Sequence, residues 1–122
     1  MTGEALSGFD PATVERVATG HEVAPKRLNN LLAAHQRLVR ETPGAGGVAG
    51  LIYEWRRAFG RDPVVARDSG AFHLAVEPHV WREYAAALDA TGTEAAALRA
   101  VHGAAATERP ADDREPMVVW RA

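Results

Sequence analysis

Cysteine is absent from the 122-residue chain, which excludes disulfide bonds, thiolate metal sites and redox chemistry through cysteine. Long apolar runs are also missing, because no stretch approaches the roughly 20 residues that span a bilayer. We therefore expect a cytoplasmic protein that makes no membrane contact. The remaining composition, 47% hydrophobic and 25% charged, is that of one ordinary globular domain.

Positive charge is concentrated in the middle of the chain. The formal net charge is −2, yet nine basic and five acidic residues lie between Lys26 and Arg82, a local net of +4 that leaves −6 elsewhere. Local positive charge is what neutralises phosphates, and arginine also bonds base edges. The alternative is that the arginines are solvated or pair with Glu54, Asp62 and Glu77.

Apolar residues at three- and four-residue spacing predict three helices in the first half of the chain, over residues 10–19, 25–42 and 48–59. Asp10 followed by Pro11 is typical of a helix start, because the aspartate accepts from free first-turn amides and proline there loses no bond. The glycine-rich run 43–47 predicts a flexible connector between the second helix and the third.

After Pro63 the apolar period changes from about 3.6 to 2, which predicts a β-hairpin over residues 64–76 with its turn at 68–70. A fourth helix is expected to begin at Pro78. The run 91–94 resembles a capping box and predicts the start of a fifth helix, because a threonine precedes a glutamate by three residues.

These elements predict an α+β fold that is mostly helical, with three helices, a β-hairpin, two further helices and a short C-terminal strand. We expect a flexible N-terminus over 1–9, one globular domain over 10–106, a linker over 107–116 and a docking segment over 117–122. An apolar terminus is costly to leave in water, so this segment is predicted to pack as an edge strand or plug on this chain or a neighbour. Its apolar residues are the candidate partner-binding residues Met117, Val118, Val119 and Trp120.

The order of elements over residues 10–77 resembles winged helix-turn-helix DNA-binding domains, with residues 78–106 as a helical extension. The resemblance implies that the helix 48–59 enters the major groove of duplex DNA and that the hairpin contacts the backbone, as in a small transcriptional regulator. The extension would supply the contact of a homodimer, because alanine-rich faces permit close helix approach. The residues that carry the resemblance, and the candidate DNA contacts, are Tyr53, Arg56, Arg57, Arg61 and Arg67.

Two other functions stay open. The protein is alternatively a non-enzymatic interaction module whose hairpin and C-terminal segment pair with a partner or a second copy by strand addition. A further possibility is a ligand-sensing or enzymatic domain. Its pocket would be formed by Trp55, Phe72, Trp81 and Tyr84.

The residue types that act in catalysis or bind metals in other proteins form no recognisable motif here. We therefore predict no catalytic residue, no metal and no cofactor. The serines lie in a loose end and a hairpin turn, without a nucleophile motif. Of the five histidines, His73 and His79 with Glu77 form the one plausible set of metal ligands, at a spacing wider than zinc sites ordinarily show. His35 lies on an apolar helix face and is expected to be a core histidine bonded to a backbone carbonyl.

Overall fold

In the computed structural model, residues 9–41, 47–68, 70–106, 110 and 112–120 are described. The predicted α+β fold with this order of elements is confirmed for them. The connector, apart from Gly47, and residues 1–8 of the predicted N-terminal segment lie outside this part of the chain. The elements are α1 (Pro11–Gly20), α2 (Pro25–Arg40), α3 (Val48–Phe59), β1 (Val64–Arg67), β2 (Ala71–Val76), α4 (Pro78–Ala87), α5 (Gly92–Ala105) and β3 (Glu115–Trp120).

The predicted helix starts are present with their capping bonds. Asp10 precedes α1 and its carboxylate accepts from the Ala12 amide at 3.4 Å. At α5 the Thr91 hydroxyl accepts from the Glu94 amide at 3.1 Å, and the Glu94 carboxylate accepts from the Thr91 amide at 3.0 Å. This capping box satisfies two amides that have no partner within the helix.

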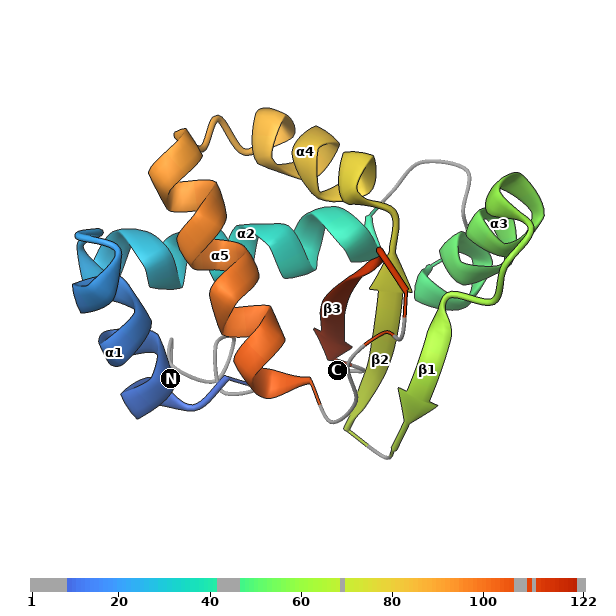
Figure 1. The fold of residues 1–122 in the computed structure, drawn as a ribbon, viewed down its shortest axis with the longest axis horizontal. Coiled ribbons are helices and arrows are strands. Elements are labelled where there is room, and N and C mark those ends of the chain that lie inside the picture. Colours follow the sequence, from blue (N-terminus) through green and yellow to red (C-terminus); the bar gives the residue numbers. More distant parts are fainter. Residues whose placement is uncertain (1–8, 42–46, 69, 107–109, 111, 121–122) are drawn as a thin grey trace.

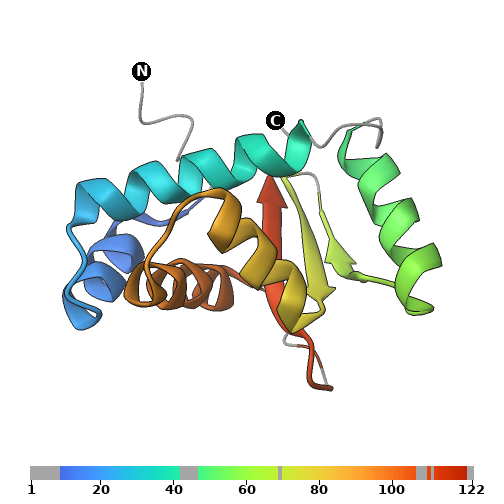
Figure 2. The same ribbon diagram turned by 90° about the horizontal axis from the view of Figure 1, so that it is seen from above.

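Helices α1, α2 and α5 pack against one another as a helical body, with α4 against α5 (Figure 1). The sheet contacts this body through one of its edges. Strand β3 lies next to the helices, β2 is in the middle and β1 is farthest away. Helix α3 stands at the far side next to β1, outside the helical body, in both views (Figure 2). The third helix of the chain therefore lies apart from the other four helices, next to the outer strand of the sheet.

Strand β2 pairs antiparallel with β1 on one side and with β3 on the other. Strand β3 begins at Glu115, two residues before the predicted docking segment, because Val76 and Ala75 at the end of β2 pair with Glu115 and Pro116. Proline is tolerated there because β3 is an edge strand, where the missing N–H removes no ladder bond. The predicted linker thus contributes its last two residues to the sheet.

The outer edge of β3 is bonded to side chains instead of to another strand. The Gln36 side chain on α2 donates to the Val118 carbonyl at 2.9 Å and accepts from the Trp120 amide at 3.0 Å. A residue of a parallel neighbouring strand makes the same pair of bonds, to residues two apart on its partner. The Gln36 amide group therefore takes the place of one residue of a fourth strand.

Three more side chains complete this edge. Trp81 on α4 donates to the Pro116 carbonyl at 3.1 Å, and Arg40 on α2 donates to the Trp120 carbonyl at 2.6 Å. On α5, Nδ1 of His102 accepts from the Val118 amide at 2.9 Å. Polar groups that an exposed edge strand offers to other chains are thus satisfied within the molecule.

The core joins the helical body to the sheet through β3. Met117, Val118 and Val119 are all completely buried. Phe9, from the segment predicted to be flexible, is also buried and packs its ring 5.3 Å from that of Trp120. Other large side chains that are fully buried are Trp81, Leu28, Leu32, Leu74 and Leu98.

Replacing Gln36 by leucine keeps the volume of the side chain and removes both of its bonds to β3. The Val118 carbonyl and the Trp120 amide then lose their partners, so we expect the free energy of unfolding to fall by about 2–4 kcal/mol. Chemical denaturation measures this loss. The control is Arg37→Leu on the same helix, where the side chain is exposed and the expected change is within about 0.5 kcal/mol. Equal stability of the two variants would contradict the role of Gln36.

Candidate functional site

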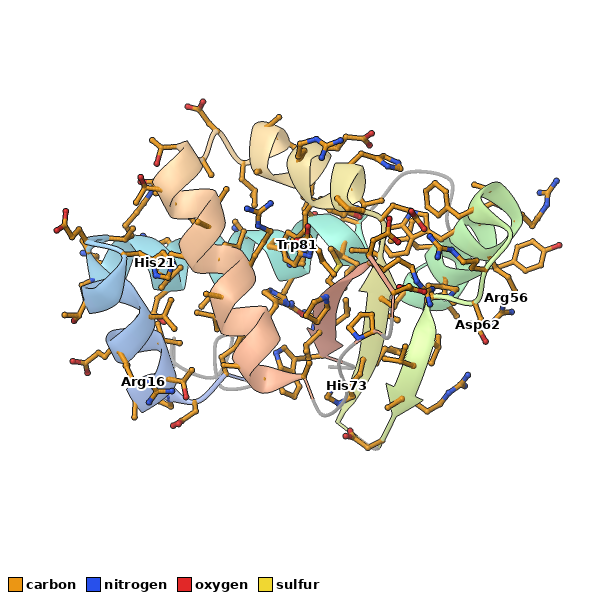
Figure 3. All side chains as sticks on the ribbon, viewed as in Figure 1. Arg16, His21, Arg56, Asp62, His73 and Trp81 are labelled. Carbon is orange, nitrogen blue, oxygen red and sulfur yellow. The ribbon has the colours of Figure 1, made fainter. Side chains whose placement is uncertain are left out.

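The arginines of the predicted DNA-binding helix lie on the outside of α3, and both pair with nearby carboxylates. Arg56 bonds Asp62 at 3.0 Å, and Arg57 lies 3.8 Å from Glu54 on the same helix. Figure 3 shows Arg56 and Asp62 together at this end of the molecule. Hydrogen bonds from the Val64 amide, and then from Arg56, lower the pKa of Asp62. The positive charges of Arg56 and Arg57 are therefore largely balanced by neighbouring carboxylates.

Arg61 is paired more extensively. Its guanidinium lies 2.7 Å from Glu77, 3.2 Å from Asp112 and 3.8 Å from Asp113. These carboxylates come from the start of α4 and from the segment before β3, so one arginine links three parts of the chain. Arg61 acts as a structural tie in this arrangement.

All five candidate contacts are exposed, and two of them, Arg57 and Arg67, lie close to aromatic rings. Tyr53 is 55% exposed, and Arg57 lies with its guanidinium 5.9 Å from the centre of the Tyr53 ring. Arg67, at the end of β1, lies over the ring of Phe72 at 6.0 Å. The structure thus places the five candidate DNA contacts on α3, the loop after it and the hairpin, interleaved with acidic side chains.

The predicted partner-binding residues lie in β3 and pack on this chain itself. The backbone of Val118 and Trp120 is bonded on one side to side chains and faces β2 on the other. A partner would have to displace the Gln36 bonds to pair with this strand. The geometry therefore gives no support to strand addition at β3.

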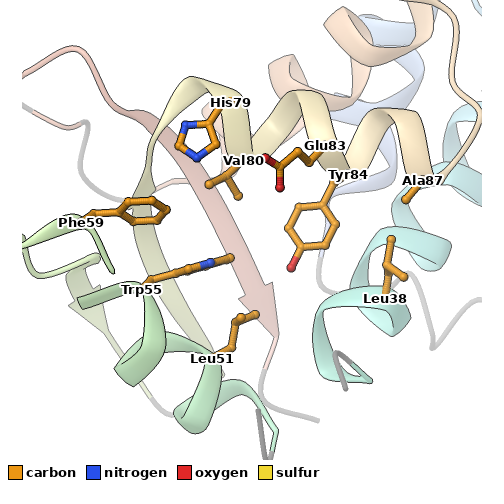
Figure 4. Close-up of a pocket in the computed structure, with 9 residues that line it drawn as sticks. All are labelled: Leu38, Leu51, Trp55, Phe59, His79, Val80, Glu83, Tyr84 and Ala87. Carbon is orange, nitrogen blue, oxygen red and sulfur yellow. The ribbon is translucent and has the colours of Figure 1, made fainter. Parts of the chain in front are cut away.

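An apolar groove lies between α3 and α4, with a volume of about 350 Å³. One stripe of α3 meets one stripe of α4 across it, and the side chains of the two helices extend toward one another (Figure 4). Residues at spacings of three and four share a helix face, which explains both stripes. The groove is lined by Leu38, Leu51, Trp55, Phe59, His79, Val80, Glu83, Tyr84 and Ala87.

Few polar groups accompany these apolar walls. Glu83 and Tyr84 extend from adjacent positions of α4, and the His79 ring stands edge-on to Phe59 with centroids 5.4 Å apart. Pockets that are mostly apolar with a few placed polar groups are typical of small-molecule sites. Of the four residues considered for a pocket, Trp55 and Tyr84 line this groove, whereas Phe72 and Trp81 are not among its lining residues.

Phe59, Leu51 and Glu83 were not predicted as pocket residues. The first two belong to the apolar stripe of the predicted third helix, where a stripe alone indicates only burial. Glu83 lies three residues after Val80 and therefore shares the apolar face of the predicted fourth helix. A carboxylate on an apolar helix face is the sequence signal that could have identified it. Sequence spacing does not reveal that α3 and α4 face one another.

Two buried histidines lie at the centre of the core. His35 stacks on Trp81 at 4.8 Å and meets the ring of His102 edge-on at 5.0 Å. The expectation that His35 bonds a backbone carbonyl is wrong, because neither of its ring nitrogens has a hydrogen-bond partner in the part of the chain that the structure describes. Packing against rings on α4 and α5 takes the place of that bond.

Burial determines the protonation of this pair. It lowers the pKa of His35 to about 3, and burial followed by the charge of His35 lowers the pKa of His102 well below its usual value. Because His102 accepts through Nδ1, its neutral ring carries the proton on Nε2. Both imidazoles are therefore neutral in the folded protein at pH 7.

The remaining candidate set of metal ligands is not assembled. His73 is buried and its Nε2 lies 3.3 Å from Asp68, while His79 packs on Phe59. Over the described ranges, no group of three or more His, Cys, Asp or Glu side chains is placed to hold a metal ion.

The comparisons with known proteins identify a family but no activity. Residues 7–121 match a domain of unknown function, DUF8048, and the chain belongs to this family. No curated protein and no solved structure matches the sequence. Within the described part of the chain, no helix is both long enough and apolar enough to cross a membrane.

The buried histidines predict a loss of stability in mild acid. The unfolded chain takes up protons near the ordinary histidine pKa, whereas folded His35 stays neutral down to a pKa of about 3. The stabilisation that depends on a neutral His35 is therefore complete above the pKa that histidine has in the unfolded chain. It is lost as the pH falls below that value. Between pH 7 and pH 5 we expect His35 to account for a loss of about 2 kcal/mol.

Urea denaturation at several pH values between 7 and 5 measures this loss. The variant His35→Phe keeps a ring stacked on Trp81 but removes the titrating group, so its stability is expected to depend less steeply on pH. His21→Phe is the control, because it removes a histidine that is only partly buried and that lies outside the packed pair. Parallel pH profiles for wild type and His35→Phe would contradict the assignment.

Proposed function

We propose that this protein is a ligand-binding domain whose site is the groove between α3 and α4. The observation that carries the proposal is a concave apolar surface of about 350 Å³ with the rings of Trp55, Phe59 and Tyr84 in its walls. Its volume lies at the lower end of the range for small-molecule pockets. The ligand is therefore expected to be a small organic molecule.

The surrounding structure supports a site at this place. Both helices are anchored, α4 through the buried Trp81 and α3 through Leu51 and Ile52. Trp55 and Phe59 are only partly buried, although they belong to the same stripe as Leu51. Large aromatic side chains left half-covered in a concave surface gain contact area when a ligand fills it.

Trp55→Ala removes the largest ring of the groove and is expected to weaken binding of small neutral aromatic compounds, such as indole, by roughly tenfold or more. Two-dimensional NMR titration measures the affinity and locates the shifts, which should centre on Leu51, Val80 and Ala87. Tyr53→Ala is the control, because Tyr53 lies exposed on another face of the same helix. Shifts scattered over the molecule, or equal effects of the two variants, would contradict the proposal.

A second candidate is the DNA-binding regulator that the order of elements suggests. The specific observation in its favour is that Tyr53, Arg56 and Arg57 share the exposed side of α3 and that Arg67 is exposed on the hairpin. Phosphate binding would have to compete with Asp62 and the other paired carboxylates. The geometry therefore supports this function less well than ligand binding.

The double variant Arg56→Ala/Arg57→Ala tests DNA binding. If the two arginines bind phosphates, affinity for duplex DNA falls, and the slope of log affinity against log salt decreases by about one unit for each phosphate interaction that the variant removes. Fluorescence anisotropy at two or more salt concentrations measures both quantities. Arg16→Ala, on α1 at the opposite end of the molecule, is the control (Figure 3). Absence of salt-dependent retention of the intact protein on duplex DNA would remove this function.

A further inference from the structure

Glu83 gives the groove a single fixed charge. Among the described residues that line the groove, none is lysine or arginine and Glu83 is the only acidic one. It lies on the same face of α4 as Val80, Tyr84 and Ala87, at the spacings of three and four that place side chains together. Any ligand in the groove therefore meets a negative charge on the α4 side.

Three other carboxylates, on α3, in the loop after it and just before α4, differ from Glu83 in their pairing. Glu54, Asp62 and Glu77 each lie within 4.0 Å of an arginine nitrogen, at 3.8, 3.0 and 2.7 Å. Among the described residues, no such ion pair includes Glu83. A carboxylate left without a cation beside an apolar groove is complementary to a positively charged ligand.

The aromatic walls favour the same kind of ligand. Trp55 and Phe59 come from α3 and Tyr84 from α4, so rings lie on both sides of the space next to Glu83 (Figure 4). The faces of aromatic rings carry negative charge and attract cations, most strongly in tryptophan. An ammonium group thus gains from the carboxylate and from the rings, whereas an anion gains from neither.

We propose that the groove binds a small apolar organic cation, with an alkylated ammonium group beside Glu83 and the apolar part of the molecule against Trp55. This inference rests on the proposed ligand-binding function and names the chemistry of its ligand. An apolar body fits the leucine and valine walls, and a volume of about 350 Å³ holds a molecule the size of a substituted benzylammonium.

The experiment compares three probes with a common aromatic body and different charge. They are benzyltrimethylammonium, uncharged tert-butylbenzyl alcohol and anionic benzenesulfonate, titrated into the full chain by NMR at pH 8, where an ordinary imidazole is neutral. We expect the cation to bind roughly tenfold more tightly than the anion, with the alcohol between them. Added salt should weaken binding of the cation alone.

Glu83→Gln removes the charge and keeps the shape of the side chain. It is expected to lower the affinity for benzyltrimethylammonium by about fivefold and to leave that for the alcohol unchanged. Glu15→Gln is the matched control, because Glu15 is exposed and belongs to α1, which does not line the groove. Unchanged unfolding midpoints establish that both variants are folded.

The outcomes separate the two proposals. If the cation binds more tightly than the other two probes and this difference is lost in Glu83→Gln, both proposals are supported. Equal binding of all three probes in the groove, insensitive to Glu83→Gln, overturns the cationic ligand and leaves the ligand-binding site in place. Failure of every probe to shift the groove resonances overturns the ligand-binding function together with the inference that rests on it.

Discussion

The fold depends on how the outer edge of β3 is bonded. Val118 and Trp120 direct backbone groups away from β2, where a neighbouring strand would normally be, and the side chains of Gln36, His102 and Arg40 bind them instead. Unpaired backbone groups in the interior are expensive, so these bonds, together with the buried side chains of β3, hold the helical body and the sheet together. One strand near the end of the sequence thereby connects α2 and α5 to the rest of the sheet.

This bonding also directs attention to one surface for function. The outward backbone groups of Val118 and Trp120 in β3 are hydrogen-bonded within the chain, and the apolar residues of this strand belong to the core. Arg61 likewise forms ion pairs with three carboxylates of the same chain. The groove between α3 and α4 differs, because its aromatic rings are only partly covered and Glu83 has no ion-pair partner among the described residues. The proposals for ligand binding and for a cationic ligand follow from that contrast.

Local pattern was enough to predict the elements of the fold but not their contacts. Asp10, Pro11 and the Thr91–Glu94 capping box act within a few residues, so the helix starts were predictable from sequence. Gln36 was not identified, because a glutamine on an apolar helix face has no meaning until a strand 82 residues later supplies its partner. The pocket considered from the sequence shares only Trp55 and Tyr84 with the groove, since the approach of α3 to α4 depends on tertiary packing. His35 was correctly placed in the core, but its bonding was wrong because ring packing replaced the expected carbonyl.

Amide hydrogen exchange at Val118 tests the bonding of β3 most directly. In the structure its N–H donates to Nδ1 of the completely buried His102, so exchange should require unfolding of the molecule. NMR measurement at neutral pH is expected to show the Val118 amide exchanging as slowly as the best-protected amides of β2. Exchange at the rate of an unprotected amide would mean that the edge of β3 is open to solvent and that side chains of the helical body do not hold the strand.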